Sequence, residues 1–458
     1  MRFVPSPEPH LAIRCAYQLV NSGNQPLESI RVSVPPAQAF HRTVISARWN
    51  DQPIVSEVIS TASDTEYGDT VELRLPVAWR QKQKGALVLQ YDLTSGSHLG
   101  SFLAVSTETF FAYPESWNPS LLPAKHLLGT GGVPPKQWTI SIRVPAGYLV
   151  HGSGTAGKRV SSGGSWIYPF TQHRHDFASF AAGGNYVETN IASNGRDVRF
   201  WTRKPVDPTV AAKAAASVSR RARYYEAEYG SPAKIAGSIR LVECVVPANT
   251  FGCGALPETI LVDQAWVARG LAEKQFYDDA NFELAHTWFG GAVHVSFDQY
   301  PLPMDGLAPY AGWEAQAVED GADDARSSRL QTLIADFDKR VEVCKEKIVL
   351  PLPSGSRGCT YSAAWTKSAL FFFALEDRMG RPAFHRALKS LLADRRGSDM
   401  GLEDLISAME SQTNDPQGPF VRHWLKHPGI PEDFRARYSM DVAPAANPEN
   451  SSPKEPHP

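Results

Sequence analysis

Hydrophobic and polar residues alternate, or nearly alternate, in several short runs of the first 190 residues. Three of these runs are Ala12–Val20, Thr70–Leu75 and Thr139–Val144, and residues such as Gly, Pro, Asn and Ser separate them. A period of two is typical of strands with one buried face, and the separating residues are typical of turns. We therefore predict an antiparallel β-sandwich domain over residues 1–190.

The pattern changes to helical spacing near Pro208. An Ala-rich stretch continues to Tyr229, and a hydrophobic run at residues 237–246 then predicts a buried strand. The charged and periodic stretch at residues 313–347 predicts further helices. Helices mixed with strands indicate an α/β domain, which we place at residues 191–360.

The last part of the chain is predicted to be helical over residues 361–440. Its most hydrophobic run, Ala369–Leu375, is much shorter than the roughly eighteen residues of a membrane span and indicates a buried helix. Residues 441–458 are rich in Pro, Ser, Asn and charge, which predicts a disordered tail. The predicted fold class is therefore α+β with several domains.

Composition and charge are those of a soluble globular protein. Of the 458 residues, 42% are hydrophobic and 21% are charged, and the formal net charge is −2. A nucleic-acid-binding protein normally carries a dense basic stripe, which this sequence lacks. We expect a peptide or protein partner, no nucleic acid and no membrane span, while the oligomeric state stays open. The first ten residues lack the apolar stretch of a secretory signal, so the protein is expected to be cytoplasmic as the sequence stands, or exported if a signal was removed.

The five cysteines are at positions 15, 244, 253, 344 and 359 and show no C-x-x-C spacing. This pattern indicates neither a structural zinc site nor a dense disulfide scaffold, so we expect most of them to be buried thiols. Cys244 and Cys253 flank a predicted turn, and a disulfide can join them if the protein is exported.

The most informative segment is residues 281–290, which read Asn-Phe-Glu-Leu-Ala-His-Thr-Trp-Phe-Gly. In the motif H-E-x-x-H, two histidines on one helix face bind Zn²⁺, and the glutamate beside the first acts as general base. Glu283 and His286 keep their places in this motif. Phe282 stands where the first histidine would be, and its ring has no lone pair for a metal.

Other segments agree with this motif. Thr287–Gly290 follows His286 directly, and Met304–Ala308 begins eighteen residues after His286. The sequence resembles the aminopeptidase N family of gluzincin zinc metallopeptidases, whose signature is H-E-L-A-H-x-W-F-G, followed by a glutamate ligand within N-E-G-x-A. Further similar segments are Asp176–Gly183, Arg223–Gly230, Trp365–Ala369 and Phe420–Leu425. The resemblance covers about residues 1–440 and implies a thermolysin-like catalytic domain between the β-sandwich and the short C-terminal helical part.

The resemblance also implies roles for single residues. In the family, two histidines and a glutamate bind zinc, a second glutamate activates water, and a tyrosine stabilises the oxyanion. Glu283 and His286 match, whereas the missing histidine falls on Phe282, the distal glutamate on Asp305 and the tyrosine on Trp365. The indole N–H of Trp365 can donate to an oxyanion, although its geometry differs from that of a phenol.

The remaining metal ligands are His286 and Asp305. The Asp305 carboxylate is shorter than that of glutamate by one C–C bond, about 1.5 Å, and a catalytic zinc normally takes three protein ligands. We therefore expect zinc to bind weakly or not at all. His294 and Asp278 are the nearest candidates for a replacement ligand, but neither is placed to fill the vacancy without rearrangement.

The family recognises the amino terminus of its substrate with the motif G-x-M-E-N. The corresponding residues here include Gly254, Ala255 and Glu258. Two interpretations of Glu258 stay open: it binds the ammonium group of a substrate, or it is an exposed glutamate after a turn proline.

Three functions fit these observations. A catalytically silent relative uses the peptidase cleft to bind a peptide or a protein. An active zinc aminopeptidase with atypical ligands removes N-terminal residues from peptides, since Glu283 and His286 are kept. The third function is a purely structural role as a domain of a larger assembly, which a large exposed apolar patch away from the cleft would favour. The substitution at Phe282 favours the first.

Overall fold

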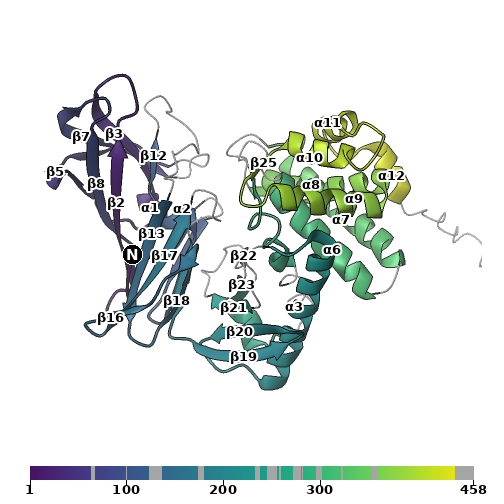
Figure 1. Ribbon diagram of the computed structural model, residues 1–458, viewed down its shortest axis with the longest axis horizontal. Coiled ribbons are helices and arrows are strands. Elements are labelled where there is room, and N and C mark those ends of the chain that lie inside the picture. Colours follow the sequence, from purple (N-terminus) through teal and green to yellow (C-terminus); the bar gives the residue numbers. More distant parts are fainter. Residues whose placement is uncertain are drawn as a thin grey trace, which may run out of the picture.

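The computed structural model describes residues 1–62, 68–98, 101–122, 137–173, 180–232, 238–244, 255–256, 259–271, 280, 282–295, 302–320, 323–352 and 358–438 (Figure 1). The tail predicted at residues 441–458 lies outside these ranges, as does the first half of the segment Asp176–Gly183.

In the described part of the chain, three β-sheets make up the amino-terminal region. The largest has the strand order β15-β17-β13-β1-β2-β8-β4-β5, with β16 beside β17. Its strands are β1 (Arg2–Val4), β2 (His10–Val20), β4 (Ser46–Trp49), β5 (Gln52–Ile54), β8 (Lys84–Leu93), β13 (Gln137–Pro145), β15 (Thr155–Ala156), β16 (Val160–Ser162) and β17 (Ser165–His173). Its described strand pairs are antiparallel except for β1 with β13.

Two smaller sheets accompany it. One has the order β12-β3-β7-β6, and the other has the order β14-β18-β11-β10-β9. Their strands are β3 (Leu27–Val34), β6 (Ser56–Ser60), β7 (Asp69–Trp79), β9 (Gly96–His98), β10 (Ser101–Val105), β11 (Thr109–Ala112), β12 (Ser120–Leu122), β14 (Leu149–Gly152) and β18 (Ala181–Gly184), and the short helices α1 (Ala37–Phe40) and α2 (Pro114–Trp117) lie between them in the chain.

Alternation along the strands explains how these sheets form a core. Every second residue is buried in most of β8, for example Leu87 and Leu89, and at the start of β2, where Leu11 and Ile13 are buried. These side chains belong to the same buried cluster as Val32 of β3. Burial of the apolar face is the main stabilising term of such a sandwich. The predicted β-rich amino-terminal domain is confirmed, and β2, β7 and β13 are three of the predicted strands.

A mixed sheet follows, with the order β19-β20-β21-β23-β22. Its strands are β19 (Val187–Ser193), β20 (Arg196–Thr202), β21 (Ser238–Cys244), β22 (Ala255–Leu256) and β23 (Thr259–Asp263), and α4 (Gln264–Ala268) comes directly after β23. The three central strands are parallel, whereas β19 and β22 are antiparallel edges.

Helix α3 (Pro208–Tyr229) packs against β19 and β20 and has the limits predicted from the sequence. Asp207 caps its amino terminus, because its carboxylate accepts hydrogen bonds from the backbone N–H groups of Thr209 and Val210.

The remaining described elements are mostly helices, and they lie at the end of the molecule opposite the nine-stranded sheet (Figure 1). They are the π-helical turn η2 (Leu302–Gly306), α6 (Leu307–Asp320), α7 (Asp323–Cys344), α8 (Gly358–Met379), α9 (Arg381–Asp394), α10 (Leu402–Glu410), α11 (Gly418–Lys426) and α12 (Glu432–Tyr438), with the short parallel pair β24 (His294–Val295) and β25 (Asp399–Met400). The run Ala369–Leu375 is buried throughout, as predicted. No described helix is both long and apolar enough to cross a membrane.

The mixed sheet and the helices share one buried cluster. The domain limits at residues 190 and 360 therefore stay predictions, since no separate core marks the second limit.

The cysteines differ from the sequence-based expectation. Cys344 and Cys359 form a disulfide, Cys244 is also disulfide-bonded, and Cys15 is free. The expectation that most cysteines are buried thiols is therefore wrong. Cys344 is the last residue of α7, and Cys359 is the second residue of α8. Only the packing of these two helices brings the sulfur atoms together.

Candidate active site

The segment that carries Glu283 and His286 is helical only at its start. Residues 282–285 are helical, and a turn follows from His286 to Trp288. In this turn the N–H of His286 donates to the carbonyl of Glu283 at 3.2 Å, and the N–H of Trp288 donates to that of Ala285 at 2.9 Å. Such bonds over three residues tighten the last turn of a helix. The helix therefore ends earlier than the motif predicts.

Buried aromatic residues fix this segment in the core. Trp288 and Phe289 are only 1% and 2% exposed, so they are held by packing on all sides. The indole N–H of Trp288 also donates to the carbonyl of Gly230, the residue after α3, at 2.7 Å. The resemblance at Thr287–Gly290 thus falls on residues that anchor the site.

Phe282 is half-buried and lies among other aromatic rings. Its ring stands edge-on to His286, with centroids 5.2 Å apart, and edge-on to Trp365 at 5.7 Å. Trp365 in turn stands edge-on to Trp313 of α6 at 5.8 Å. A Cβ atom added at Gly312 would lie 3.3 Å from the Cα of Phe282, so α6 approaches this position closely. Phe282 is therefore part of a packed aromatic wall.

Asp305 lies in the π-helical turn η2 and is 6% exposed. The phenol of Tyr361 donates a hydrogen bond of 2.5 Å to its Oδ2. Tyr361 and Trp365 are four residues apart on α8, so they lie on one face of that helix. The sequence analysis missed Tyr361, although its spacing from Trp365 is a signal that could have found it.

The turn η2 is held tightly against α8. A Cβ atom at Gly306 would lie 2.8 Å from Phe372 and 2.9 Å from Ser368. Only glycine fits such a contact without displacement of the neighbours. The position of Asp305 therefore depends on the glycine that follows it.

His286 lies near Asp305 and presents one ring nitrogen to the backbone. Its Nδ1 is 3.2 Å from the carbonyl oxygen of Phe289, and because a carbonyl only accepts, this nitrogen carries the hydrogen. Burial lowers the pKa of His286, while the Asp305 carboxylate and the Phe289 carbonyl act in the opposite direction. The Nε2 atom thus keeps a lone pair for a ligand.

The structure describes only some of the other predicted site residues. Ala255 begins the edge strand β22, whereas Gly254, Glu258 and Asp278 lie outside the described residues. His294 lies in β24, which pairs with β25. The proposed amino-terminus site and the replacement ligands therefore stay predictions.

A second cluster of possible metal ligands lies deeper in the protein. The ligand atoms of Glu314, Glu376 and His385 all lie within 4.8 Å of one another. Two cations already occupy this cluster, since Arg326 contacts both Glu376 at 2.8 Å and Glu314 at 3.3 Å, and Arg381 contacts Glu314 at 2.7 Å. The arginines neutralise the carboxylates in place of a metal.

His385 is also fully engaged. Its Nδ1 lies 2.5 Å from a carboxylate oxygen of Glu228, and its Nε2 lies 2.9 Å from the phenol oxygen of Tyr310. With both nitrogens bound to α3 and α6, the imidazole has no lone pair for a metal. We interpret the cluster as a structural network that joins the helices.

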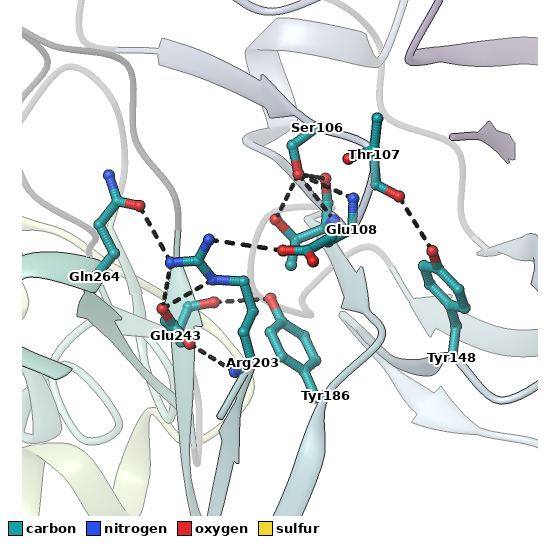
Figure 2. A network of polar contacts seen from close by, with 9 residues as sticks. Ser106, Thr107, Glu108, Tyr148, Tyr186, Arg203, Glu243 and Gln264 are labelled. Carbon is teal, nitrogen blue, oxygen red and sulfur yellow. Dashed lines mark hydrogen bonds and ion pairs between the residues drawn. The ribbon is translucent and has the colours of Figure 1, made fainter. Parts of the chain in front are cut away.

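A third polar network connects the amino-terminal sheets with the mixed sheet (Figure 2). Arg203, just after β20, places its Nε and Nη2 atoms 3.0 and 2.8 Å from one carboxylate oxygen of Glu243. Its Nη1 lies 3.7 Å from Glu108, in the turn between β10 and β11. Tyr186 adds a hydrogen bond of 2.7 Å to the carbonyl of Glu243. The network fixes the mixed sheet relative to the β-rich region.

No protein-family model and no curated protein matches the chain. Solved structures do match. An M1 zinc metallopeptidase from Deinococcus radiodurans is 18% identical, with a TM-score of 0.63, and the match covers 94% of this chain and 93% of that chain. This chain has the M1 metallopeptidase fold.

A second matching structure is that of native yeast LTA4 hydrolase. It is 12% identical with a TM-score of 0.65, and the match covers 92% of this chain and 66% of that chain. Both matches extend over the β-rich region, the mixed sheet and the helices. The fold class predicted from the sequence is confirmed.

Proposed function

We propose that this protein is a pseudopeptidase, which binds peptides or a protein segment in the cleft of an M1 metallopeptidase fold without hydrolysing them. The proposal rests on one observation above all: the ring of Phe282 is packed against His286 and Trp365. The sequence motif aligns this phenylalanine with the first zinc ligand of the metallopeptidases. A hydrocarbon ring cannot coordinate a divalent cation.

The remaining donors do not fit a catalytic zinc site. His286 offers one nitrogen, and the carboxylate of Asp305 already accepts the phenol hydrogen of Tyr361 at 2.5 Å. A metal at Asp305 must compete with this short hydrogen bond. Two protein ligands, one of them engaged, are fewer than the three that catalytic zinc sites use.

Without zinc, water is not activated as a nucleophile. Water has a pKa of about 15.7, against about 7 when it is bound to zinc in a hydrolase. Glu283 cannot activate unbound water across this difference by itself. We therefore assign Glu283 and Asp305 to ligand binding, where two carboxylates beside an aromatic wall favour a positively charged or aromatic group of the ligand.

A peptide is the expected class of ligand. The Deinococcus metallopeptidase has also been solved with a bound Tyr-Ser-Ala substrate, and the cleft of this chain is proposed to hold a similar extended segment. Gly254, Ala255 and Glu258 are proposed to contact the amino terminus of the peptide.

The test combines metal analysis, hydrolysis and binding. Protein purified without chelator should contain far less than one zinc per chain, and it should not cleave aminoacyl reporter substrates with or without added zinc. The Tyr-Ser-Ala peptide should bind saturably, and Glu283→Gln should weaken this binding. Stoichiometric zinc together with cleavage that Glu283→Gln abolishes would refute the proposal.

A second function is an active zinc aminopeptidase with atypical ligands. It is favoured by the position of His286 near Asp305: burial lowers the pKa of the His286 imidazole, and the Asp305 carboxylate lies close enough to oppose this shift. In that case added zinc should increase both the thermal stability and the cleavage rate. If added zinc changes neither the thermal stability nor the cleavage rate, this alternative is excluded.

A further inference from the structure

A hollow of about 320 Å³ lies on the outer face of the nine-stranded sheet, far along the chain from the candidate active site. Residues that line it include Arg2, Arg14, Arg143, Gln90, Asp92 and Ile167. The three arginines come from the adjacent strands β2, β1 and β13. Figure 1 shows these strands in the region away from the helices.

The strand register places the three guanidinium groups on one face. Arg2 is paired with Arg143 of β13 on one side and with Ala12 of β2 on the other. Arg14 is two residues beyond Ala12, so its side chain points the same way. The opposite face of these strands carries core residues such as Ile13.

The charges in this hollow are not balanced. Asp92, paired with Ala12, is the acidic residue among its lining side chains. In the ranges that the structure describes, Arg2, Arg14 and Arg143 form no ion pair. Other arginines of the same region do have carboxylate partners, namely Arg31 with Glu72, Arg42 with Asp69 and Arg74 with Glu57.

Neighbouring like charges on a sheet face reduce stability. Three arginines around one hollow are therefore better explained by a bound anion than by folding alone. Arginine is suited to this task, since its guanidinium donates two parallel hydrogen bonds to a carboxylate or a phosphate. Gln90, paired with Arg14, adds an amide donor, and Ile167, paired with Arg143, adds an apolar wall.

We propose that this hollow binds a small ligand with at least two anionic oxygen-bearing groups, carboxylate or phosphate. The volume of about 320 Å³ is at the lower end of the range for small-molecule sites. It fits a compact di- or trianion and not a folded partner. This site is separate from the proposed peptide cleft, so either proposal can fail without the other.

Isothermal titration calorimetry on the full chain tests the site, with sodium pyrophosphate and sodium citrate as separate probes at constant ionic strength. We expect saturable one-site binding of at least one probe. The double variant Arg14→Gln/Arg143→Gln should weaken it by about tenfold or more. Tighter binding of pyrophosphate identifies a phosphate ligand, and tighter binding of citrate identifies a carboxylate ligand.

Arg48→Gln is the matched control. Arg48 is paired with Val88 on the same sheet face, outside the hollow, and it donates to the carbonyl of Asp51. Its replacement removes one positive charge from this face and should leave the affinity within about twofold. If the double variant does not fold, Arg2→Gln is measured in its place. Absence of saturable binding to both probes, or equal weakening by Arg48→Gln, overturns the proposal.

Discussion

The ring of Phe282 stands edge-on to the imidazole of His286, with the two centroids 5.2 Å apart. An imidazole at residue 282 would face the same space with a lone pair. We predict that Phe282→His raises the affinity for zinc by about tenfold or more, because a second nitrogen ligand joins His286. Equilibrium titration with a competing zinc chelator measures the change.

A second substitution, Tyr361→Phe, tests whether Asp305 becomes a zinc ligand in this variant. The phenol of Tyr361 holds Asp305, so Tyr361→Phe should free the carboxylate and increase zinc affinity further, but only when Phe282→His is also present. The four proteins form a double-mutant cycle, and a positive coupling is expected. Equal effects of Tyr361→Phe in both backgrounds would show that Asp305 does not become a ligand. Adding Asp305→Glu and Trp365→Tyr to Phe282→His should then increase the rate of peptide hydrolysis.

The pair Arg203–Glu243 should contribute strongly to stability. Glu243 is 3% exposed, and Arg203→Met leaves its carboxylate buried without its main cation. We expect the free energy of unfolding to fall by about 3–5 kcal/mol. The matched control is Glu108→Gln, which removes the exposed partner at 3.7 Å and should cost less than about 1 kcal/mol. Urea denaturation of the three proteins compares these values.

Lys367 joins three segments of the helical region. Its ammonium donates to the backbone carbonyls of Ile348 at 2.8 Å, His427 at 2.5 Å and Leu425 at 3.4 Å. Burial lowers the pKa of Lys367 to about 7, but three carbonyl acceptors favour the protonated form, which has three hydrogens.

Replacement of this lysine tests its structural role. Lys367→Met should lower the free energy of unfolding by about 2–3 kcal/mol, because buried carbonyls lose their donors. Lys389→Met is the control, since Lys389 donates to the carbonyl of Ala227 at an exposed position. Calorimetric melting should show a clear decrease in stability for Lys367→Met and almost none for Lys389→Met. Similar decreases would assign the effect to loss of charge.

The disulfide Cys344–Cys359 closes a loop of 15 residues between α7 and α8. Chain-entropy arguments give about 3 kcal/mol for a loop of this length. We predict a loss of about this size for Cys344→Ser/Cys359→Ser in urea denaturation under oxidising conditions. Cys15→Ser, at the free cysteine, is the control for serine replacement. If the double variant matches the wild type, the bond does not form in solution.

Glu376 makes the free energy of unfolding depend on pH. Burial, with the Glu314 carboxylate, raises the pKa of Glu376 from 4.5 to about 7. The folded protein therefore keeps this proton to higher pH than the unfolded chain does. The resulting stabilisation is complete below pH 4.5 and is lost as the pH rises through about 7.

Glu376→Gln cannot titrate, so its free energy of unfolding should fall less between about pH 5 and pH 8 than that of the wild type. Glu403→Gln, at a carboxylate that is 78% exposed, should leave the wild-type profile unchanged. Urea denaturation at several pH values measures both profiles. Parallel profiles for Glu376→Gln and the wild type would contradict the assignment.

Local patterns were sufficient for much of the fold. Alternation located β2, β7 and β13, and the Ala-rich spacing located α3 with its limits at Pro208 and Tyr229. These signals are local because a strand or a helix exposes and buries residues with a fixed period. The helix at Glu283 was the exception, since its end at Ala285 depends on how Trp288 and Phe289 are buried.

The sequence by itself determined the chemistry at residue 282, because the lack of a lone pair on phenylalanine is a property of the side chain and not of its surroundings. Only the tertiary structure decided that Tyr361 binds Asp305, that Arg203 binds Glu243, that Cys344 meets Cys359, and that three arginines share one hollow. Each of these contacts joins residues from different elements. Their distance is set by packing and strand register, and no pattern along the chain encodes it directly.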